Sequence, residues 1–323
     1  MKCKTTILQW GGGWPDSIGN AFIDFGSMYA LKKAVEESNV VLSSNFPRSF
    51  LSRGFISNRV RILDLSILDK TNNLLDIREV VKADYIILSG EILTPSWIRL
   101  CVSHRFLKKK DAKIIIHGGG GSRYTKREFE TVRHFLSKIN FYAFISRDEK
   151  VFREYKGIAQ HSFNGIDCAF FAKDYFHPAS FNLPRYITFT FDKIKEPKLK
   201  SEERMIIRTH HAYWSQSGFL KKFAYFNRQN FSKKNTLISD LPQDYLNVYF
   251  NTEETHSDRV HACVPTLAFG KPAKLYIDTP RAALFDRINA GLVTSELTYP
   301  SLKNIQKEKD RQVRFLSEIL NTK

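Results

Sequence analysis

Short apolar runs alternate with amphipathic stretches through the first half of the chain. Short apolar runs are typical of buried strands, whereas apolar positions three and four residues apart are typical of helices. Strands are expected at Thr6–Gln9, Val40–Leu42, Asp84–Leu88, Lys113–His117 and Phe141–Ile145. Helices are expected at Ile18–Glu37, Trp97–Leu107, Lys126–Ile139 and Asp148–Tyr155. This alternation indicates βαβ units, and therefore a mainly parallel sheet with helices on both faces.

The regular pattern ends around Lys173–Pro184, where we expect a domain boundary or a crossover. Beyond it, Tyr186–Phe191 has the β-branched and aromatic residues of a strand, and the charged segment Asp192–Glu203 is expected to be exposed. Strand and helix candidates resume at Leu237–Ile238, Val248–Phe250 and Lys274–Ile277, and a charged helix is expected at Leu302–Leu320. The pattern predicts two α/β domains, residues 1–172 and 185–300, with residues 301–323 as a helix that packs back on the first.

Composition agrees with two domains and restricts the partners. A chain of 323 residues with 42% hydrophobic residues is large enough for two cores. Its 50 Lys and Arg residues against 33 Asp and Glu give a net charge of +17, which favours nucleic acid, an anionic membrane surface or small anionic substrates. The basic residues are scattered and no nucleic-acid-binding signature is present, so nucleic acid is disfavoured.

The four cysteines, at positions 3, 101, 168 and 263, lie far apart in the sequence. No C-x-x-C pair is present, which argues against a zinc cluster and a disulfide framework, so neither a metal nor an oxidising compartment is expected. The first apolar run is too short for a signal peptide, and no run of about 18 apolar residues could span a membrane. We expect a cytoplasmic protein that would reach a lipid-linked substrate from the inner membrane surface.

Two glycine-rich segments follow predicted strands. Trp10–Asp24 combines three glycines with a helix start at Asn20, which is typical either of a nest of backbone amides for an anion or of a tight turn. It lacks both the P-loop and the dinucleotide spacing. Gly118–Gly121 is costly in chain entropy, so something must approach its backbone closely. A ligand phosphate or sugar is the favoured reason, and a close contact between domains is the alternative.

Two further segments carry charged groups. In Ser146–Asp148, Arg147 stands at a strand end, where it suits a carboxylate or phosphate, although an ion pair capping the next helix from Asp148 would look the same. In His256–Pro272, Ser257 and Asp258 can cap a helix whose opening turn holds Arg259 and His261. A helix N-terminus favours anions, so this pair suits a reaction that releases phosphate. A purely structural histidine is the alternative.

Together, these four segments resemble the polysaccharide pyruvyl transferase family. The resemblance rests on Gly19–Asn20, on Gly118–Gly121, on the SRD triplet followed by Gly157 and Asp167, and on Asp258–Arg259–Val260–His261 followed by Gly270 and Pro272. These landmarks extend over most of the chain, from about residue 11 to 291. The family commonly has Gly-Asp after the Gly-Asn pair, whereas Ala-Phe-Ile-Asp follows here, and the SRD triplet lacks the family's spacing residue.

The resemblance implies two Rossmann-like domains that face a cleft, similar to GT-B glycosyltransferases. It also implies transfer from phosphoenolpyruvate to two hydroxyls of one sugar, forming a pyruvate ketal on an exopolysaccharide, another cell-surface glycan or its lipid-linked precursor, with no cofactor. Arg259 and Arg147 would bind the donor, His261 would be the acid, and Asp24 or Asp16 the base. Further substrate-binding residues would be Asn20, Gly118, Gly119, Gly120 and Ser257.

Two other functions stay open from the sequence alone. A glycosyltransferase of the same architecture would also need glycine-rich loops and cations, but it would bind a nucleotide sugar rather than phosphoenolpyruvate. A non-catalytic protein that binds sugar or nucleic acid would retain affinity without turnover, and its binding to polynucleotides would depend strongly on salt.

Overall fold

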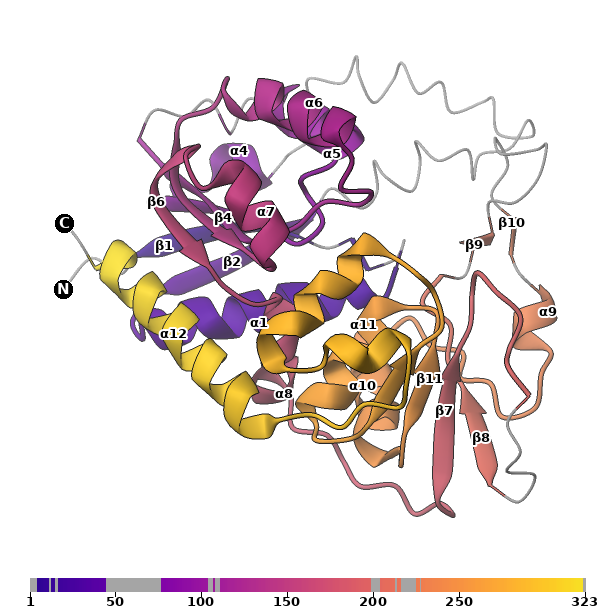
Figure 1. The fold of residues 1–323 in the computed structure, drawn as a ribbon. Helices are drawn as coiled ribbons and strands as arrows, with labels where there is room; N and C mark the ends of the chain where they lie inside the picture. Colours follow the sequence, from indigo (N-terminus) through magenta and orange to yellow (C-terminus); the bar gives the residue numbers. More distant parts are fainter. Residues whose placement is uncertain are drawn as a thin grey trace, which may run out of the picture.

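Two parallel β-sheets form the framework of the protein (Figure 1). The computed structural model describes residues 5–11, 13–14, 17–44, 77–103, 107, 111–198, 204–212, 214–215, 225–226 and 228–321. Within these residues every strand pair in both sheets is parallel, which confirms the prediction of an α/β fold with parallel sheets. We call the six-stranded sheet with its helices the N-terminal domain, and the four-stranded sheet with its helices the C-terminal domain.

The N-terminal domain has the strand order β2-β1-β3-β4-β5-β6. Its strands are β1 (Thr6–Gly11), β2 (Asn39–Ser44), β3 (Tyr85–Ser89), β4 (Lys113–Gly119), β5 (Phe141–Ser146) and β6 (Ala159–Asn164). Its helices are α1 (Gly19–Ala34), α4 (Ile77–Val80), α5 (Pro95–Ser103), α6 (Lys126–Leu136) and α7 (Glu149–Tyr155). The central strands are apolar on both faces because helices cover both sides of the sheet.

The C-terminal domain has the strand order β12-β11-β7-β8. Its strands are β7 (Tyr186–Thr190), β8 (Met205–Arg208), β11 (Thr255–Ser257) and β12 (Ala273–Leu275), and a small antiparallel pair joins β9 (Trp214–Ser215) to β10 (Tyr225–Phe226). The helices are α9 (Arg228–Phe231), α10 (Pro242–Asn251) and α11 (Val260–Ala268). Two 3-10 segments follow at η3 (Pro280–Ile288) and η4 (Gly291–Thr294). Between the domains lie η2 (Cys168–Phe171) and α8 (Ala172–Tyr175).

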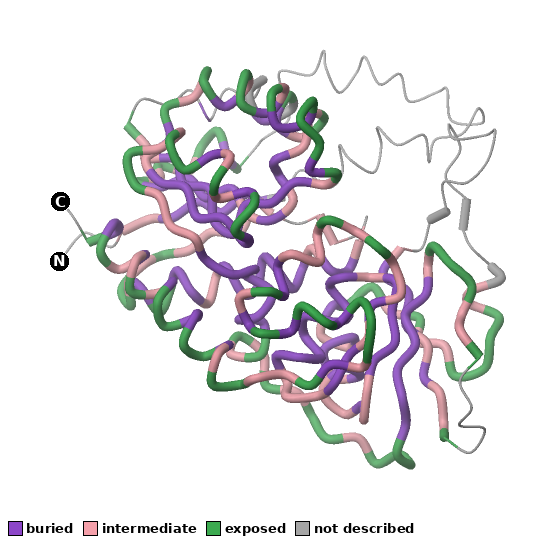
Figure 2. Tube along the Cα trace, in the orientation of Figure 1, coloured by how far each residue is buried: buried purple, intermediate pink, exposed green. Residues whose placement is uncertain are grey.

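The largest hydrophobic core runs through both domains (Figure 2). It joins Ile115 on one face of the first sheet to Phe22 of α1, and continues to Val264 of α11 and Tyr249 of α10. A second core covers the opposite face of the six-stranded sheet beneath α5, α6 and α7. Because α1 is buried between the sheet and α11, it holds the two domains together by apolar packing.

The last helix, α12 (Leu302–Leu320), packs along the N-terminal domain beside α1 (Figure 1). Its end accepts hydrogen bonds from that domain, since Tyr85 Oη donates to the Leu320 carbonyl at 3.1 Å and Tyr142 Oη donates to the Ile319 carbonyl at 2.9 Å. In its middle, Gln312 Oε1 accepts from the Ile166 amide at 2.8 Å, and Gln312 Nε2 lies 3.0 Å from His117 Nε2. Among the described residues, no helix is both long and apolar enough to cross a bilayer.

Several expected elements differ from the structure. Val248–Phe250 lies inside helix α10, and Leu237–Ile238 is neither strand nor helix. The strand expected at Lys274–Ile277 is the shorter β12. The segment Asp192–Glu203 was expected to be exposed, and residues 193–195 and 198 are, whereas residues 199–203 lie outside the described residues. By contrast, the side chain of Asp192 is only 3% exposed because it pairs with His210 and Arg259.

Candidate active site

A cavity of about 1190 Å³ opens between the two domains, beyond the carboxyl ends of the parallel strands. Its lining comes from the loops after β1, β3, β4, β7 and β11 and from the starts of α1, α5, α6, α11 and η3. Ligands of open α/β sheets bind in this place. Four of the candidate residues line it, namely Asn20, Asp24, Arg259 and His261.

Arg259 and His261 open helix α11, as the sequence predicted. Arg259 is the N-cap residue and His261 the second residue of the helix. The expected side-chain cap is absent, because Ser257 belongs to strand β11 and accepts a hydrogen bond from the Arg259 amide at 2.7 Å. Asp258 instead accepts from the backbone amides of residues 192–194 and fixes the loop after β7. This arrangement places a guanidinium and an imidazole together on one wall of the cavity.

A buried carboxylate orients Arg259. The Arg259 Nε donates to Asp192 Oδ2 at 2.7 Å, and the side chain of Arg259 is 20% exposed toward the cavity. The other oxygen, Asp192 Oδ1, lies 2.8 Å from His210 Nδ1. Burial alone would raise the pKa of Asp192, but His210 and Arg259 hold it below its usual range. Asp192 is therefore ionised and fixes the guanidinium of Arg259 through its Nε.

A second buried carboxylate orients His261. The His261 Nε2 lies 3.3 Å from Asp167 Oδ2, and the same oxygen lies 3.2 Å from Arg147 Nη1. Burial lowers the pKa of His261, and Asp167 opposes that shift without cancelling it. Burial would raise the pKa of Asp167, but His261 and Arg147 bring it below its ordinary value. A neutral imidazole held by an ionised carboxylate is thus the resting state, and added negative charge in the cavity would favour its protonation.

Arg147 does not reach the cavity. Its side chain is completely buried, pairs with Asp167 and donates from Nη2 to the Gly121 carbonyl at 3.3 Å. The sequence predicted that Arg147 binds the donor directly, but in this structure its guanidinium contacts Asp167 and does not line the cavity. The next residue, Asp148, caps α7 by accepting from the Val151 amide at 2.9 Å, as the sequence allowed. The ion pair of Arg147 is with Asp167 rather than with Asp148.

The mid-domain glycines make room for protein atoms rather than lining the cavity. A Cβ at Gly120 would lie 2.0 Å from Arg147 Nε, and one at Gly119 would lie 2.5 Å from Ile116 Cγ2. Gly118 has a φ of +66°, and a Cβ there would lie 2.7 Å from Cys168 Sγ. Close contact with neighbouring side chains therefore explains these glycines, rather than the ligand or the contact between domains that the sequence suggested. Ser257 is likewise buried outside the lining.

Helix α1 brings a carboxylate to the other side of the site. Gly19 packs against His261 so closely that a Cβ would lie 2.6 Å from the His261 Cβ. Asp24 lies five residues further along, or about 7.5 Å of helix axis. Ser89 Oγ donates to Asp24 Oδ1 at 3.1 Å, and Asn20 Nδ2 donates to the Gly13 carbonyl at 2.9 Å. Asp16 lies outside the described residues.

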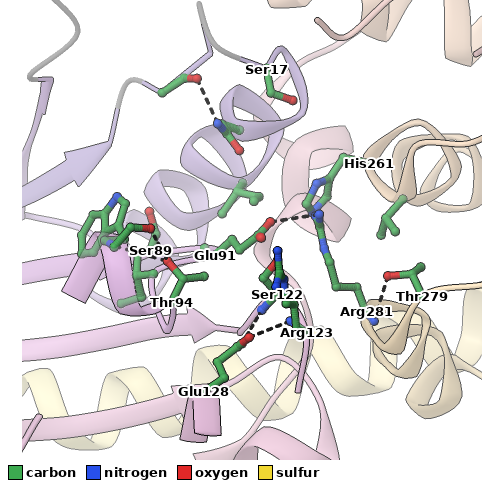
Figure 3. A pocket seen from close by; sticks show the side chains of 18 of the residues that line it. Ser17, Ser89, Glu91, Thr94, Ser122, Arg123, Glu128, His261, Thr279 and Arg281 are labelled. Atoms are coloured by element: carbon green, nitrogen blue, oxygen red, sulfur yellow. Dashed lines mark hydrogen bonds and ion pairs between the residues drawn. The ribbon is translucent and has the colours of Figure 1, made fainter. Parts of the chain in front are cut away.

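The sequence missed several charged residues of the cavity, among them Arg281, Glu91 and Lys193. Arg281, in η3, pairs through Nη1 with Glu91 Oε2 at 3.0 Å, and these two side chains approach each other near His261 (Figure 3). The Nε of Arg281 is buried without a hydrogen-bond partner among the described residues. Partial desolvation, together with the nearby Arg259 and Arg281, lowers the pKa of Lys193, although this residue is still exposed to solvent. No sequence motif marks these three residues. Glu91 and Lys193 lie in loops just after strands β3 and β7, and Arg281 follows the loop after β12.

The chemistry of the lining is polar and charged. Lys193, Arg259 and Arg281 gather on the C-terminal side, and Asp24 and Glu91 face them from the N-terminal side. Such a site suits a small molecule with more than one negative charge and a hydroxyl-bearing partner. Among the residues that the structure describes, no three His, Cys, Asp or Glu side chains are grouped as metal ligands would be.

Comparisons with known proteins agree with this geometry. A family model described as polysaccharide pyruvyl transferase matches residues 18–273. Among curated proteins, none matches the chain.

Solved structures show the same fold at low identity. UDP-N-acetylglucosamine 2-epimerase from Rickettsia bellii is 12% identical with a TM-score of 0.55, covering 98% of this chain and 95% of that one. A putative UDP-N-acetylglucosamine 2-epimerase from Listeria monocytogenes is 16% identical with a TM-score of 0.52, covering 98% and 91%. S. aureus MnaA, solved with UDP, is 16% identical with a TM-score of 0.53, covering 97% and 91%. This likeness supports the predicted GT-B-like two-domain fold.

Proposed function

Because the chain belongs to the polysaccharide pyruvyl transferase family, we propose that it transfers a pyruvyl group from phosphoenolpyruvate to two hydroxyls of one sugar. The product would be a pyruvate ketal on a cell-surface glycan or on its lipid-linked precursor. The observation that supports this most directly is the pairing of Arg259 with His261 on one wall of the cavity, with Asp24 entering from α1.

Phosphoenolpyruvate carries a carboxylate and a phosphate on three carbons, so it needs several fixed cations at short range. Arg259 is held in place by Asp192 and offers its planar fork to one of these groups. Lys193 and Arg281 lie on the same side of the cavity and suit the other. The lowered pKa of Lys193 reflects partial desolvation and electrostatic repulsion from these arginines. A bound polyanion would offset that repulsion.

The chemical step needs an acid at the donor and a base at the acceptor. His261 donates a proton to the methylene carbon, which leaves a cation-like centre at the neighbouring carbon. One sugar hydroxyl adds to that centre, the second hydroxyl follows as inorganic phosphate leaves with the electrons of its carbon–oxygen bond, and the ketal closes. Of the two hydroxyl protons, one is taken by Asp24 and the other leaves with phosphate. Asp167 keeps the ring of His261 oriented throughout.

The test is an incubation of the purified protein with phosphoenolpyruvate and a panel of galactosides, glucosides and mannosides. Phosphate release that depends on one acceptor, with a product that gains pyruvate and loses water by mass spectrometry, is the expected result. Uridine diphosphate sugars serve as the competing donors. Release of UDP in place of phosphate, with transfer of the sugar, would establish a glycosyltransferase instead.

A further inference from the structure

The cavity is larger than a three-carbon donor requires, and its N-terminal side has a character of its own. Its volume of about 1190 Å³ exceeds the range of about 300–1,000 Å³ that is usual for small-molecule sites. The donor residues all lie on the C-terminal side. In Figure 3, Thr94 and Ser89 lie across the cavity from Arg281 and Thr279. The N-terminal side is therefore the place for a second ligand.

An aromatic pair forms part of this side. Trp10 at the end of β1 and Trp97 in α5 have ring centroids 4.8 Å apart, and both line the cavity. Trp10 is 2% exposed, whereas Trp97 is partly exposed. Thr94 and Ser96, which both carry hydroxyl groups, line the cavity at the start of the same helix. An aromatic face beside hydroxyl groups suits a sugar ring, because the C–H face of a pyranose is apolar while its edge is polar.

Three arginines stand on the same side. Arg99 comes from α5, and Arg123 and Arg127 come from the loop before α6 and its first turn. Among the described residues none of the three has a carboxylate within ion-pairing distance. Three cations on one wall without carboxylate partners suit a ligand with a phosphate group, because the guanidinium fork matches its oxygens.

The fold holds these arginines in one group. The Arg99 guanidinium lies over the ring of Phe135, 5.7 Å from its centroid, which joins α5 to α6. The carboxylate of Glu128 accepts from the Ser122 amide at 2.8 Å and from the Arg123 amide at 2.9 Å. Glu128 thus fixes the loop that carries Arg123 while it leaves the arginine side chain without a carboxylate partner.

We propose that this side of the cavity is an acceptor subsite for a saccharide that carries a phosphate or diphosphate ester next to the sugar ring. Trp97 with the hydroxyls would hold the ring, and Arg99, Arg123 and Arg127 would hold the phosphate. The inference rests on the proposed function, because it assigns the acceptor of the same reaction. The proposal goes further than the function above, because it predicts that the affinity for the acceptor depends on its negative charge as well as on its sugar.

The test is equilibrium binding to the intact chain without phosphoenolpyruvate, followed by tryptophan fluorescence and calorimetry. The probes are galactose, glucose and mannose 1-phosphates, each beside the methyl glycoside of the same sugar. For at least one sugar, the 1-phosphate should bind about tenfold tighter or more, as expected for charge-assisted hydrogen bonds. Equal affinity of the phosphorylated and neutral forms for all three sugars would overturn the proposal.

Matched variants separate the two parts of the subsite. The triple variant R99Q/R123Q/R127Q should lose the preference for the phosphorylated sugar, and R99K/R123K/R127K should keep part of it. Trp97→Leu should weaken both forms alike. Phosphoenolpyruvate should bind the triple glutamine variant as it binds the wild type. A loss of phosphoenolpyruvate affinity there would assign the arginines to the donor and refute the subsite.

Two more titrations identify the source of the phosphate. The first compares galactose 1-phosphate with a galactosyl diphosphate on a short polyprenyl chain. Tighter binding of the polyprenyl compound would indicate a lipid-linked acceptor, and equal affinities would indicate a free sugar phosphate. Inorganic phosphate that binds as tightly as the sugar phosphates would refute recognition of a saccharide. None of these titrations needs turnover, so the subsite can fail while pyruvyl transfer succeeds, and the reverse.

Discussion

The two walls of the cavity hold their cations in opposite ways. On the C-terminal wall, Arg259 and His261 are each fixed by a buried carboxylate, Asp192 and Asp167. On the N-terminal wall, the arginines are exposed and the described residues offer them no carboxylate. Burying a charge carries a large desolvation penalty, and removing the partner of a buried charge is strongly destabilising. An exposed charge carries little penalty and can change its contacts easily. In the function that we propose, the first wall would carry out the chemistry and the second would recognise the acceptor.

This contrast has an energetic reason. A group that stabilises charge in a transition state contributes most when it is already oriented, because no reorganisation is needed during the reaction. A recognition surface gains less from rigidity, since its contacts form in the ground state as well as in the transition state. Changes on the C-terminal wall should therefore affect kcat strongly, and changes on the N-terminal wall should affect binding and salt dependence.

The largest effect is expected for His261→Gln. Glutamine keeps polarity and approximate size but cannot deliver a proton, so kcat should fall by about 10²–10⁴-fold while the affinity for phosphoenolpyruvate changes little. Steady-state kinetics beside direct binding would measure both. His117→Gln is the matched control, because this histidine is buried outside the cavity. Near-normal turnover of the His261 variant would exclude it as the acid.

Arg259→Lys should lower kcat/KM for phosphoenolpyruvate by about 100-fold, since lysine keeps the charge but loses the fork and the bond to Asp192. Thermal unfolding should show that the fold survives. Arg208→Lys provides the comparison, because Arg208 pairs with Glu196 outside the cavity. Equal losses in the two variants would mean that the Arg259 effect is structural.

Asp192→Asn should act through Arg259 rather than on the substrate. Without the carboxylate, the guanidinium loses its orientation, and KM for phosphoenolpyruvate should rise by about tenfold with a smaller change in kcat. Asp192→Glu should recover part of the loss. A change in kcat alone, with KM unaltered, would contradict a positioning role for Asp192.

Acid should destabilise the protein through its buried histidines. Burial lowers the pKa of His117 and of His211 to about 3. Between pH values of about 3 and the unfolded pKa of about 6.5, the unfolded state binds more protons than the folded state. The free energy of unfolding therefore falls as the pH falls, by at most about 1.4 kcal/mol per pH unit for each histidine. Denaturant titrations at a series of pH values should show that the free energy of unfolding falls less steeply with falling pH in His117→Gln than in the wild type.

The smallest effect concerns salt. Raising ionic strength from about 0.05 to 0.5 M should weaken binding of a sugar phosphate at the exposed wall several-fold, because the Debye length falls from about 14 Å to about 4 Å in that range. Binding of phosphoenolpyruvate at the half-buried Arg259 should change less. If both ligands respond equally, the two walls do not differ in the way proposed.

The pattern of the sequence was most informative where one element carries its own signal. The apolar runs located β1 to β5, and the segment around Arg259 and His261 located the start of α11 on the cavity wall. Asp24, reached through the Gly19–Asn20 landmark, also lines the cavity. These residues were accessible because local periodicity and helix-start chemistry are readable in sequence.

What the sequence did not reveal depends on long-range contacts. Strand β6 is polar and lies at the sheet edge, so it lacks an apolar pattern. Arg281 and Asp192 gain their roles from partners about 190 and 67 positions away in the chain. The sequence could not show what the glycines near Arg147 make room for. A glycine is needed both where a ligand approaches the backbone and where another side chain does.

The hydrogen bonds between α12 and the N-terminal domain also have a consequence for folding during synthesis. The hydroxyls of Tyr85 and Tyr142 find their acceptors at Leu320 and Ile319, and the amide of Ile166 finds its acceptor at Gln312. A ribosome synthesises the sheet long before those partners exist. The part of the N-terminal domain that α12 covers is therefore still exposed when that domain emerges from the exit tunnel, and the domain reaches its native packing only after residue 320 has been added.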